Sequence, residues 1–293
     1  MPKTVLITGC SDGGLGSSLA LAFHQHGFHV FATARDPSRM GNLEQLSNNV
    51  TPLTMDVLKS DDIEAVAEKI SQETGGTLDY LVNNAGRNHF MPVLDEDLSD
   101  TRELFAINLL APIAVTQAFA PMLSKAKGTA VYIVSTVGHL NIPYMGTYSA
   151  SKMSLEIVAD TLRLELAPFG VNVVEVVTGG VKSLGQTYFS DSKLPSQSHR
   201  ALNSSQLYKS IESIVKSRAQ GKEGMERMDA TDYATAVVDD ILNGARGRIW
   251  HGIHADAVRM STTSTQVSQS AMDARAVMGT GLDMVGSEVN RKA

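Results

Sequence analysis

Tyr148 and Lys152 form a pair suited to acid–base chemistry. They stand early in a helical pattern of apolar residues, where a four-residue spacing puts two side chains on one face. A free phenol has a pKa of about 10 and exchanges protons poorly at neutral pH, but a neighbouring cation stabilises the phenolate. We therefore expect Tyr148 to donate and accept a proton, with Lys152 lowering its pKa.

A third candidate, Ser135, follows a short apolar run at residues 130–134 and stands thirteen positions before Tyr148. At the end of a strand its hydroxyl is placed to donate a hydrogen bond to a substrate oxygen. A Tyr-x-x-x-Lys pair by itself is common on helix surfaces, so this chemistry needs the support of other motifs.

A glycine-rich turn at residues 8–16 lies between a strand-like run and an amphipathic helical pattern. Glycine permits positive φ and lets the backbone approach a pyrophosphate, whose charge is stabilised at a helix N-terminus. Turns in general favour glycine, so the strand before and the helix after carry this assignment. The residues expected to bind a dinucleotide here are Gly9, Ser11, Asp12, Gly14, Leu15 and Gly16.

The second strand, at residues 28–33, leads to Ala34 and Arg35. Sites that prefer NAD usually place a carboxylate at this point, whereas a guanidinium suits the 2′-phosphate of NADP. Arg35 therefore favours NADPH/NADP+ over NADH. Asp36 follows directly and, in a shifted register, would serve a ribose, so NADH stays open as the alternative.

The elements that must position these residues alternate between short β-branched runs and longer helical patterns. This alternation indicates stacked βαβ units, that is, an α/β fold with a doubly wound, Rossmann-like parallel sheet and helices on both faces. We expect a single domain over residues 1–253, with a substrate loop at about 183–227. Residues 254–293 form a partly polar extension for which we predict poor order.

Composition excludes several classes of protein. The 293 residues are 43% hydrophobic, enough for one large core, and the net charge of −6 gives no basis for nucleic-acid binding. A single cysteine, Cys10, and scattered histidines predict no metal site and a cytoplasmic location. No apolar run is long enough to predict a membrane span.

The substrate is expected to be a mainly apolar small molecule, because the loops beyond the strands are rich in aromatics and methionines and poor in charge. Taken singly, each such residue is more often a packing residue than a ligand contact. The residues predicted to contact the substrate are His89, His139, Tyr144, Tyr188 and Phe189.

Four ordered motifs resemble those of the short-chain dehydrogenase/reductase family: residues 8–16, residues 83–86, Ser135, and Tyr148 with Lys152. The resemblance spans about residues 3–183 and implies that Ser135 positions the carbonyl, while Lys152 also binds the nicotinamide ribose. It adds Asn108 as the anchor of a proton-relay water and implies a homodimer or homotetramer. The cofactor contacts that it implies beyond the glycine turn are Asp56 and Val57 at the adenine, Asn83, Ala85, Gly86, Tyr148, Lys152, Gly179 and Val181.

Within the family, the loop with Cys10 and the segment 177–182 resemble fungal acyl-dihydroxyacetone-phosphate reductases and, more loosely, hydroxysteroid dehydrogenases. Many relatives carry Pro-Gly where Thr178 and Gly179 stand, which leaves this turn open. The polar stretch 261–270 argues against attachment to lipid. Our hypothesis is an NADPH-dependent ketone or aldehyde reductase, acting for example on a biosynthetic intermediate, a lipid ketone or a polycyclic ketone. The alternatives are a non-redox isomerase, dehydratase or cyclase, and a dinucleotide-binding sensor.

Overall fold

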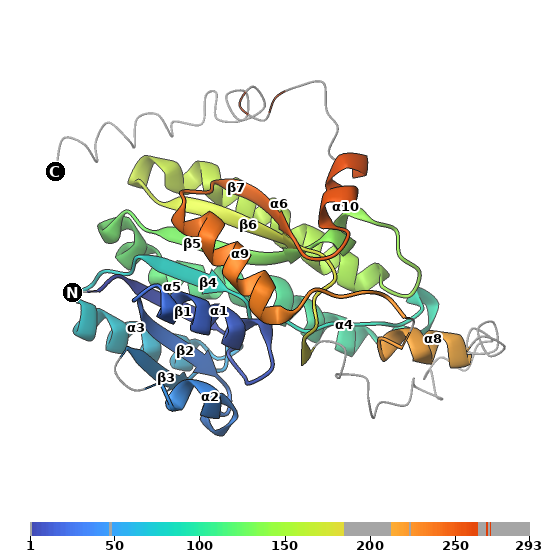
Figure 1. The fold of residues 1–293 in the computed structure, drawn as a ribbon, viewed down its shortest axis with the longest axis horizontal. Coiled ribbons are helices and arrows are strands. Elements are labelled where there is room, and N and C mark those ends of the chain that lie inside the picture. Colours follow the sequence, from blue (N-terminus) through green and yellow to red (C-terminus); the bar gives the residue numbers. More distant parts are fainter. Residues whose placement is uncertain are drawn as a thin grey trace.

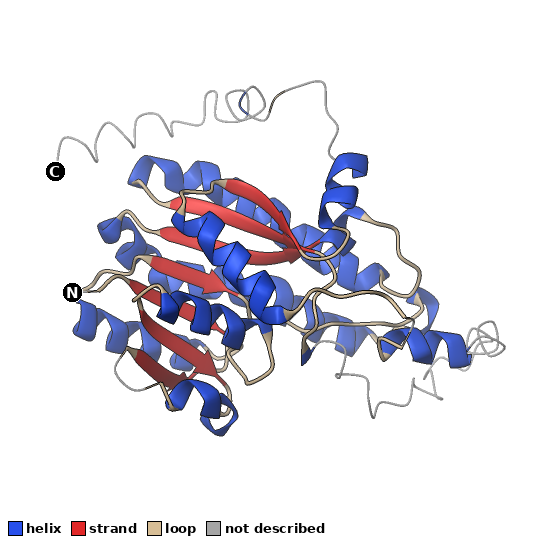
Figure 2. Ribbon diagram, in the orientation of Figure 1, coloured by secondary structure: helices blue, strands red, loops and turns tan. Residues whose placement is uncertain are grey.

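The computed structural model describes residues 2–46, 49–184, 212–222, 224–262, 268 and 270. In this part of the chain, seven strands form one parallel sheet in the order β3-β2-β1-β4-β5-β6-β7. Helices cover both of its faces (Figures 1 and 2). The predicted doubly wound α/β sheet is confirmed.

The first half of the chain builds the β3 side of the sheet. Its elements are β1 (Thr4–Thr8), α1 (Leu15–Gln25), β2 (His29–Ala34), η1 (Pro37–Met40), α2 (Gly41–Glu44), β3 (Val50–Thr54), α3 (Ser60–Thr74) and β4 (Tyr80–Asn83). After β3 the chain returns to the centre and places β4 on the other side of β1. The order reverses between β1 and β4, so a crevice is expected at the carboxyl ends of these two strands.

The second half extends the sheet toward β7 and contributes the longest helices. Its elements are η2 (Val93–Asp95), α4 (Leu98–Phe105), η3 (Ala106–Leu110), α5 (Ala111–Ala126), β5 (Thr129–Ser135), η4 (Thr136–His139), α6 (Gly146–Leu166), η5 (Ala167–Phe169), β6 (Asn172–Thr178), α8 (Glu212–Ala219), α9 (Ala230–Leu242), β7 (Gly247–His251) and α10 (Ala255–Thr262).

Two apolar layers hold the helices to the sheet. Val5 and Ile7 of β1 pack with α1 and α9 on one face, whereas Leu6 between them packs with α3, α5 and α6 on the other. Successive side chains of a strand point to opposite faces, so a strand covered on both sides has no polar alternate. This explains the unbroken apolar runs in the sequence.

The helix Leu98–Ala126, formed by α4, η3 and α5, is long and apolar enough by length and composition to cross a membrane. No continuous apolar run in the sequence had indicated this. Val115, Phe119 and Leu123 of this helix are buried in the layer beneath the sheet. A core helix of a globular domain can have the same length and composition. Packing against the sheet therefore explains the apolar character of this helix without a membrane.

Beyond residue 253 the structure adds a helix that the sequence analysis did not predict. In α10, Ala255 and Val258 are buried, and the helix packs on β7. The order of most of the remaining extension stays a prediction, because it lies outside the described residues. Before α9, Asp229 caps the helix, since its carboxylate accepts a hydrogen bond of 2.9 Å from the Thr231 N–H.

Candidate active site

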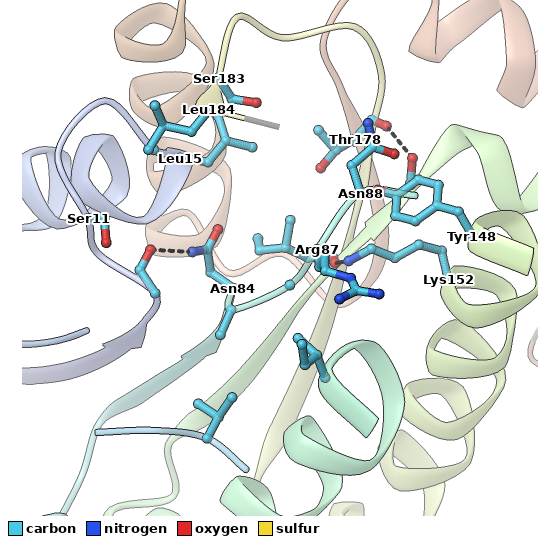
Figure 3. Close-up of a pocket in the computed structure, with 18 of the residues that line it drawn as sticks. Ser11, Leu15, Asn84, Arg87, Asn88, Tyr148, Lys152, Thr178, Ser183 and Leu184 are labelled. Carbon is cyan, nitrogen blue, oxygen red and sulfur yellow. Dashed lines mark hydrogen bonds between the residues drawn. The ribbon is translucent and has the colours of Figure 1, made fainter. Parts of the chain in front are cut away.

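A cavity of about 510 Å³ opens at the carboxyl ends of the strands. Figure 3 shows it with the glycine turn on one side and α6 on the other. The structure brings most of the predicted site residues together here. The predicted residues that line it are Gly9, Ser11, Gly14, Leu15, Arg35, Asp56, Val57, Ala85, Gly86, Ser135, Tyr148, Lys152, Gly179 and Val181.

Tyr148 and Ser135 are hydrogen-bonded to each other inside this cavity. The Ser135 hydroxyl also donates to the Thr178 carbonyl at 3.3 Å. Desolvation by burial raises the pKa of Tyr148 to about 12, and the hydrogen bond with Ser135 opposes this only in part. The phenol is therefore protonated at neutral pH.

Lys152 projects from α6 toward the same cavity (Figure 3), and only 6% of the residue is exposed. Its ammonium donates to the Ile133 carbonyl at 2.9 Å, and burial lowers its pKa to about 8. The expected net lowering of the Tyr148 pKa is not found in this structure, because desolvation dominates the environment of the phenol. The contribution of Lys152 beside a bound nicotinamide stays a prediction.

Asn108 lies in η3, a π-helical turn between α4 and α5, and is fully buried. Its Oδ1 accepts from the Arg87 N–H at 2.8 Å, and its Nδ2 donates to the Arg87 carbonyl at 3.0 Å and to Ser151 Oγ at 3.1 Å. A Cβ on Gly86 would lie 3.3 Å from Asn108 Oδ1 and 3.5 Å from Lys152 Nζ. Asn108 thus ties the loop after β4 to α6, close to Lys152. The relay water stays a prediction.

The glycine turn has no room for side chains at two positions. Gly9 has φ +74°, and a Cβ there would lie 2.9 Å from Ala85 Cα. A Cβ on Gly16 would lie 2.4 Å from the Gly9 carbonyl oxygen and 2.5 Å from Asn84 Nδ2. Gly16 therefore does not line the cavity but lets α1 begin directly against the turn.

Asn84 was missed by the sequence analysis, which selected Asn83 instead. Asn84 lines the cavity, and its Nδ2 donates to the carbonyls of Thr8 at 2.8 Å and Gly9 at 3.1 Å (Figure 3). Asn83 is buried on the other side of the strand end and donates to Thr116 Oγ1 at 3.1 Å. The alternation of side chains along a strand sends these neighbours to opposite faces.

Asp12 is a further predicted cofactor residue that does not line the cavity. Its carboxylate oxygens accept from the Asn42 N–H at 3.3 and 3.4 Å, at the start of α2. A carboxylate is stabilised at a helix N-terminus, whereas next to a pyrophosphate it would meet a like charge.

The strand end predicted to select the cofactor presents two cations to the cavity, Arg35 and Arg39. Asp36, the alternative ribose ligand, caps η1 instead. Its Oδ1 accepts from Ser38 N–H at 3.0 Å and from Ser38 Oγ at 2.7 Å, and these bonds lower the pKa of its carboxyl group.

The predicted substrate residues that the structure describes do not line this cavity. His89 and His139 are buried in pairs with glutamates, with Nε2 to Oε2 distances of 2.6 Å to Glu96 and 2.9 Å to Glu156. Tyr144 packs against Phe90 with a ring centroid separation of 5.8 Å. Tyr188 and Phe189 lie outside the described residues. The cavity is also lined by Asn88, Val137, Met145, Ser183 and Leu184.

Thr178 replaces the proline of many relatives, and the structure shows what its hydroxyl contacts. Its Oγ1 lies 2.6 Å from the Tyr233 hydroxyl, and its carbonyl accepts from Ser135. Gly179 follows, where a Cβ would lie 2.3 Å from the Ile253 carbonyl oxygen. The turn that the sequence left open is therefore fixed by α9 and by the segment after β7.

Comparison with known proteins agrees with this arrangement. The family described as short chain dehydrogenase matches residues 3–193. A short-chain dehydrogenase of Penicillium crustosum is 44% identical over 250 residues, which cover 85% of this chain and 88% of the relative. The NADPH-dependent 1-acyldihydroxyacetone phosphate reductase of Schizosaccharomyces pombe is 36% identical over 257 residues, 88% of this chain and 83% of the relative.

Among solved structures, a short chain dehydrogenase from Burkholderia cenocepacia in complex with NADP superposes with a TM-score of 0.70 at 22% identity. The match covers 94% of this chain and 97% of that one, and at this identity it shows the shared fold alone. A nicotinamide cofactor is typical of the family. The resemblance inferred from the motifs is confirmed, and this chain is a short-chain dehydrogenase/reductase with relatives among the fungal members of that family.

Proposed function

We propose that this protein uses NADPH to reduce a ketone or aldehyde carbon of a mainly apolar small molecule. The observation that carries the proposal is that one cavity joins two arginines, Arg35 and Arg39, to the hydrogen-bonded pair Tyr148 and Ser135. The arginines suit a 2′-phosphate, and the pair suits a carbonyl oxygen that gains a proton.

The residues present fit a dinucleotide. Gly9 and Gly86 line the cavity at places where a side chain would meet backbone or the catalytic groups, and α1 begins beside it at Leu15. Arg35 would hold the 2′-phosphate, and Asp56 with Val57 would hold the adenine. When bound, the nicotinamide supplies the hydride. The S. pombe relative is named for NADPH, and the B. cenocepacia structure holds NADP, which supports the choice of cofactor.

The side chains of this chain supply the proton and the orientation. Ser135 donates a hydrogen bond that orients the carbonyl oxygen, and Tyr148 donates the proton that this oxygen gains. Because burial keeps the pKa of Tyr148 at about 12, the phenol is protonated at neutral pH and has a proton to donate. Reduction of the carbonyl consumes this proton.

The part of the cavity near Tyr148 is suited to an apolar substrate. Val137 and Met145 line the cavity, and Asn88 adds an amide near Tyr148 (Figure 3). Two ketones represent the classes considered: 1-decalone for fused rings and 1-palmitoyl-dihydroxyacetone phosphate for acyl chains. The second is the class of compound named for the S. pombe relative.

The test measures NADPH oxidation with each ketone for the wild type and for Tyr148→Phe. Removal of the phenol proton should lower kcat by about 10²–10⁴-fold and change the Kd for NADPH far less. Tyr80→Phe, outside the cavity, is the matched control and should keep the wild-type rate. An unchanged rate in Tyr148→Phe would contradict the assigned role.

The same assay separates the alternative functions. Product formed at full rate by cofactor-free protein would favour non-redox chemistry. NADPH binding without turnover of any carbonyl compound would favour a sensor.

We also propose a homodimer or homotetramer that forms through the helices around Asn108 and Tyr148. Leu110 and Ile157 on these helices are 58% and 60% exposed, which supports a contact there. Sedimentation velocity at micromolar concentration tests this, and a monomer would contradict it.

A further inference from the structure

Glu96 is a buried carboxylate that the proposed reaction does not use. It lies between η2 and α4, and only 3% of its side chain is exposed. Burial of a carboxylate is unfavourable unless hydrogen bonds replace water. Its Oε1 accepts from Thr147 Oγ1 at 2.5 Å, and its Oε2 lies 2.6 Å from His89 Nε2 and 3.4 Å from Thr101 Oγ1. Three polar groups from separate segments therefore converge on it.

One of these groups belongs to the catalytic helix. Thr147 is the second residue of α6 and stands directly before Tyr148. Within α6 itself, Met145 at the N-cap makes no side-chain hydrogen bond, and the first turn contains no acidic residue. A negative charge is stabilising at this end of a helix. Glu96 provides that charge from another segment of the chain.

The turn before α6 is pressed against the same segment. The Met91 N–H donates to the Tyr144 carbonyl at 2.7 Å. A Cβ on Gly146 would lie 2.8 Å from Val93 Cγ2. Tyr144 itself has φ +71°, a conformation that a non-glycine residue adopts only when its surroundings hold it there. The first turn of α6 is thus held from outside.

We propose that Glu96, held by His89, is a positioning residue that acts through Thr147 to fix the direction in which the Tyr148 hydroxyl meets Ser135. None of Glu96, His89 and Thr147 is among the residues that line the cavity, so they act without touching the substrate. The inference rests on the proposed function, in which Tyr148 donates the proton. A displacement of about 1 Å at a reacting group can lower a rate by about 10²-fold, so a small shift of this turn is sufficient to matter.

The experiment compares Thr147→Val, Thr147→Ser and Glu96→Gln with the wild type. Valine keeps the shape of threonine without the hydroxyl, whereas serine keeps the hydroxyl. Thr161→Val is the matched control, because Thr161 is an exposed threonine of the same helix whose Oγ1 bonds the Ile157 carbonyl within that helix. Hydride transfer is measured in a single turnover with NADPH and 1-decalone, and NADPH affinity by fluorescence titration.

We expect Thr147→Val to slow hydride transfer by about tenfold, with KM for the ketone and Kd for NADPH within about twofold of the wild type. Glu96→Gln should slow it to a smaller extent, and Thr147→Ser should restore the wild-type rate. A wild-type rate in Thr147→Val, or a rate in Thr147→Ser as slow as in Thr147→Val, would overturn the inference. A parallel loss of NADPH affinity would show a merely structural role and overturn it as well.

Crystal structures of the wild type and Thr147→Val make the result independent of the substrate. We expect the hydrogen bond between Tyr148 and Ser135 to be lost or lengthened in the variant, and an unchanged bond would overturn the inference. If the wild type reduces no carbonyl compound, the proposed function fails while this structural comparison still decides the positioning role.

Discussion

At the end of the cavity near β1 and β2, the chain presents glycine backbone and two exposed arginines, whereas near α6 it presents buried polar side chains bonded to protein partners. The end near β1 and β2 depends on glycines, because a side chain at these positions would collide with neighbouring backbone. The second is shaped by hydrogen bonds that hold Tyr148, Ser135 and Lys152 in place. Variants at the first end should therefore change cofactor binding, and variants at the second should change rate.

The largest effect on cofactor binding is expected at Gly16, where a Cβ would lie 2.4 Å from the Gly9 carbonyl oxygen. Gly16→Ala must push the glycine turn away from α1, because the contact is with backbone. We expect the Kd for NADPH to rise by about 10²-fold, equivalent to about 2.7 kcal/mol, as measured by fluorescence titration. Gly41→Ala is the control, since a Cβ there would meet only Asp12 Oδ2 at 3.6 Å. Equal affinities in the two variants would refute the role of close packing at Gly16.

Arg35 gives a smaller and more selective effect. Arg35→Ala removes a cation that lines the cavity where the 2′-phosphate is expected. A charge-assisted hydrogen bond contributes about 1.5–3 kcal/mol, so KM for NADPH should rise by about tenfold or more. KM for NADH, which lacks the phosphate, should not change. Arg102→Ala on α4 is the matched control, and equal changes for both cofactors would show that Arg35 does not recognise the phosphate.

The same comparison shows which features the sequence was able to predict. The strands, the glycine turn and the pair Tyr148 and Lys152 depend on local patterns, and the structure has them at the predicted places within a few residues. Arg35 was found because it directly follows β2. In each case the signal lies within one element and its neighbours.

The failures involve contacts that the spacing of residue types does not show. His89 and His139 were assigned to the substrate, but they pair with the buried glutamates Glu96 and Glu156, 7 and 17 residues further along the chain. The choice of Asn83 over Asn84 depended on where β4 ends. The direction of the pKa shift of Tyr148 depends on how many groups bury the phenol, which no local spacing reveals.

The pH dependence sharpens the comparison at the catalytic end. Burial lowers the pKa of Lys152 to about 8, whereas the pKa of Tyr148 is raised to about 12. Above pH 8 the ammonium of Lys152 is lost while the phenol keeps its proton. We expect kcat/KM for carbonyl reduction to be constant below pH 8. Above pH 8 it should fall, and by pH 9 to 10 it should be about tenfold lower.

Lys152→Arg tests the assignment of this pH dependence. Arginine stays charged throughout this range, so the variant should be slower than the wild type but should show no fall near pH 8. A wild-type profile that stays flat up to pH 10 would contradict the role of the Lys152 ammonium.

The smallest effect is expected behind the catalytic helix, where Glu175 of β6 is fully buried. Arg248 Nε lies 3.2 Å from Glu175 Oε2 and 2.9 Å from Glu156 Oε1, and Arg248 also pairs with Asp160. Burial, together with the charges of Asp160 and Glu156, raises the pKa of Glu175 to about 8, and Arg248 opposes the shift. Three carboxylates thus share Arg248, although Asp160 also pairs with Arg163 and Glu156 with His139, and Glu175 holds a proton at neutral pH.

The sign of the pH effect on stability follows from this raised pKa. Between pH 4.5 and 8 the folded chain keeps a proton that the unfolded chain has lost, so the free energy of unfolding falls as the pH rises. Glu175→Gln keeps the shape of the side chain and removes the titration. At pH 8.5 we expect the variant to be more stable than the wild type by about 1 kcal/mol in urea unfolding, with a weaker dependence on pH from 5 to 8. Glu165→Gln, at an exposed position of α6, is the control and should change neither the stability nor its pH dependence. A Glu175→Gln variant that is less stable than the wild type at pH 8.5 would show that the ionised carboxylate stabilises Arg248.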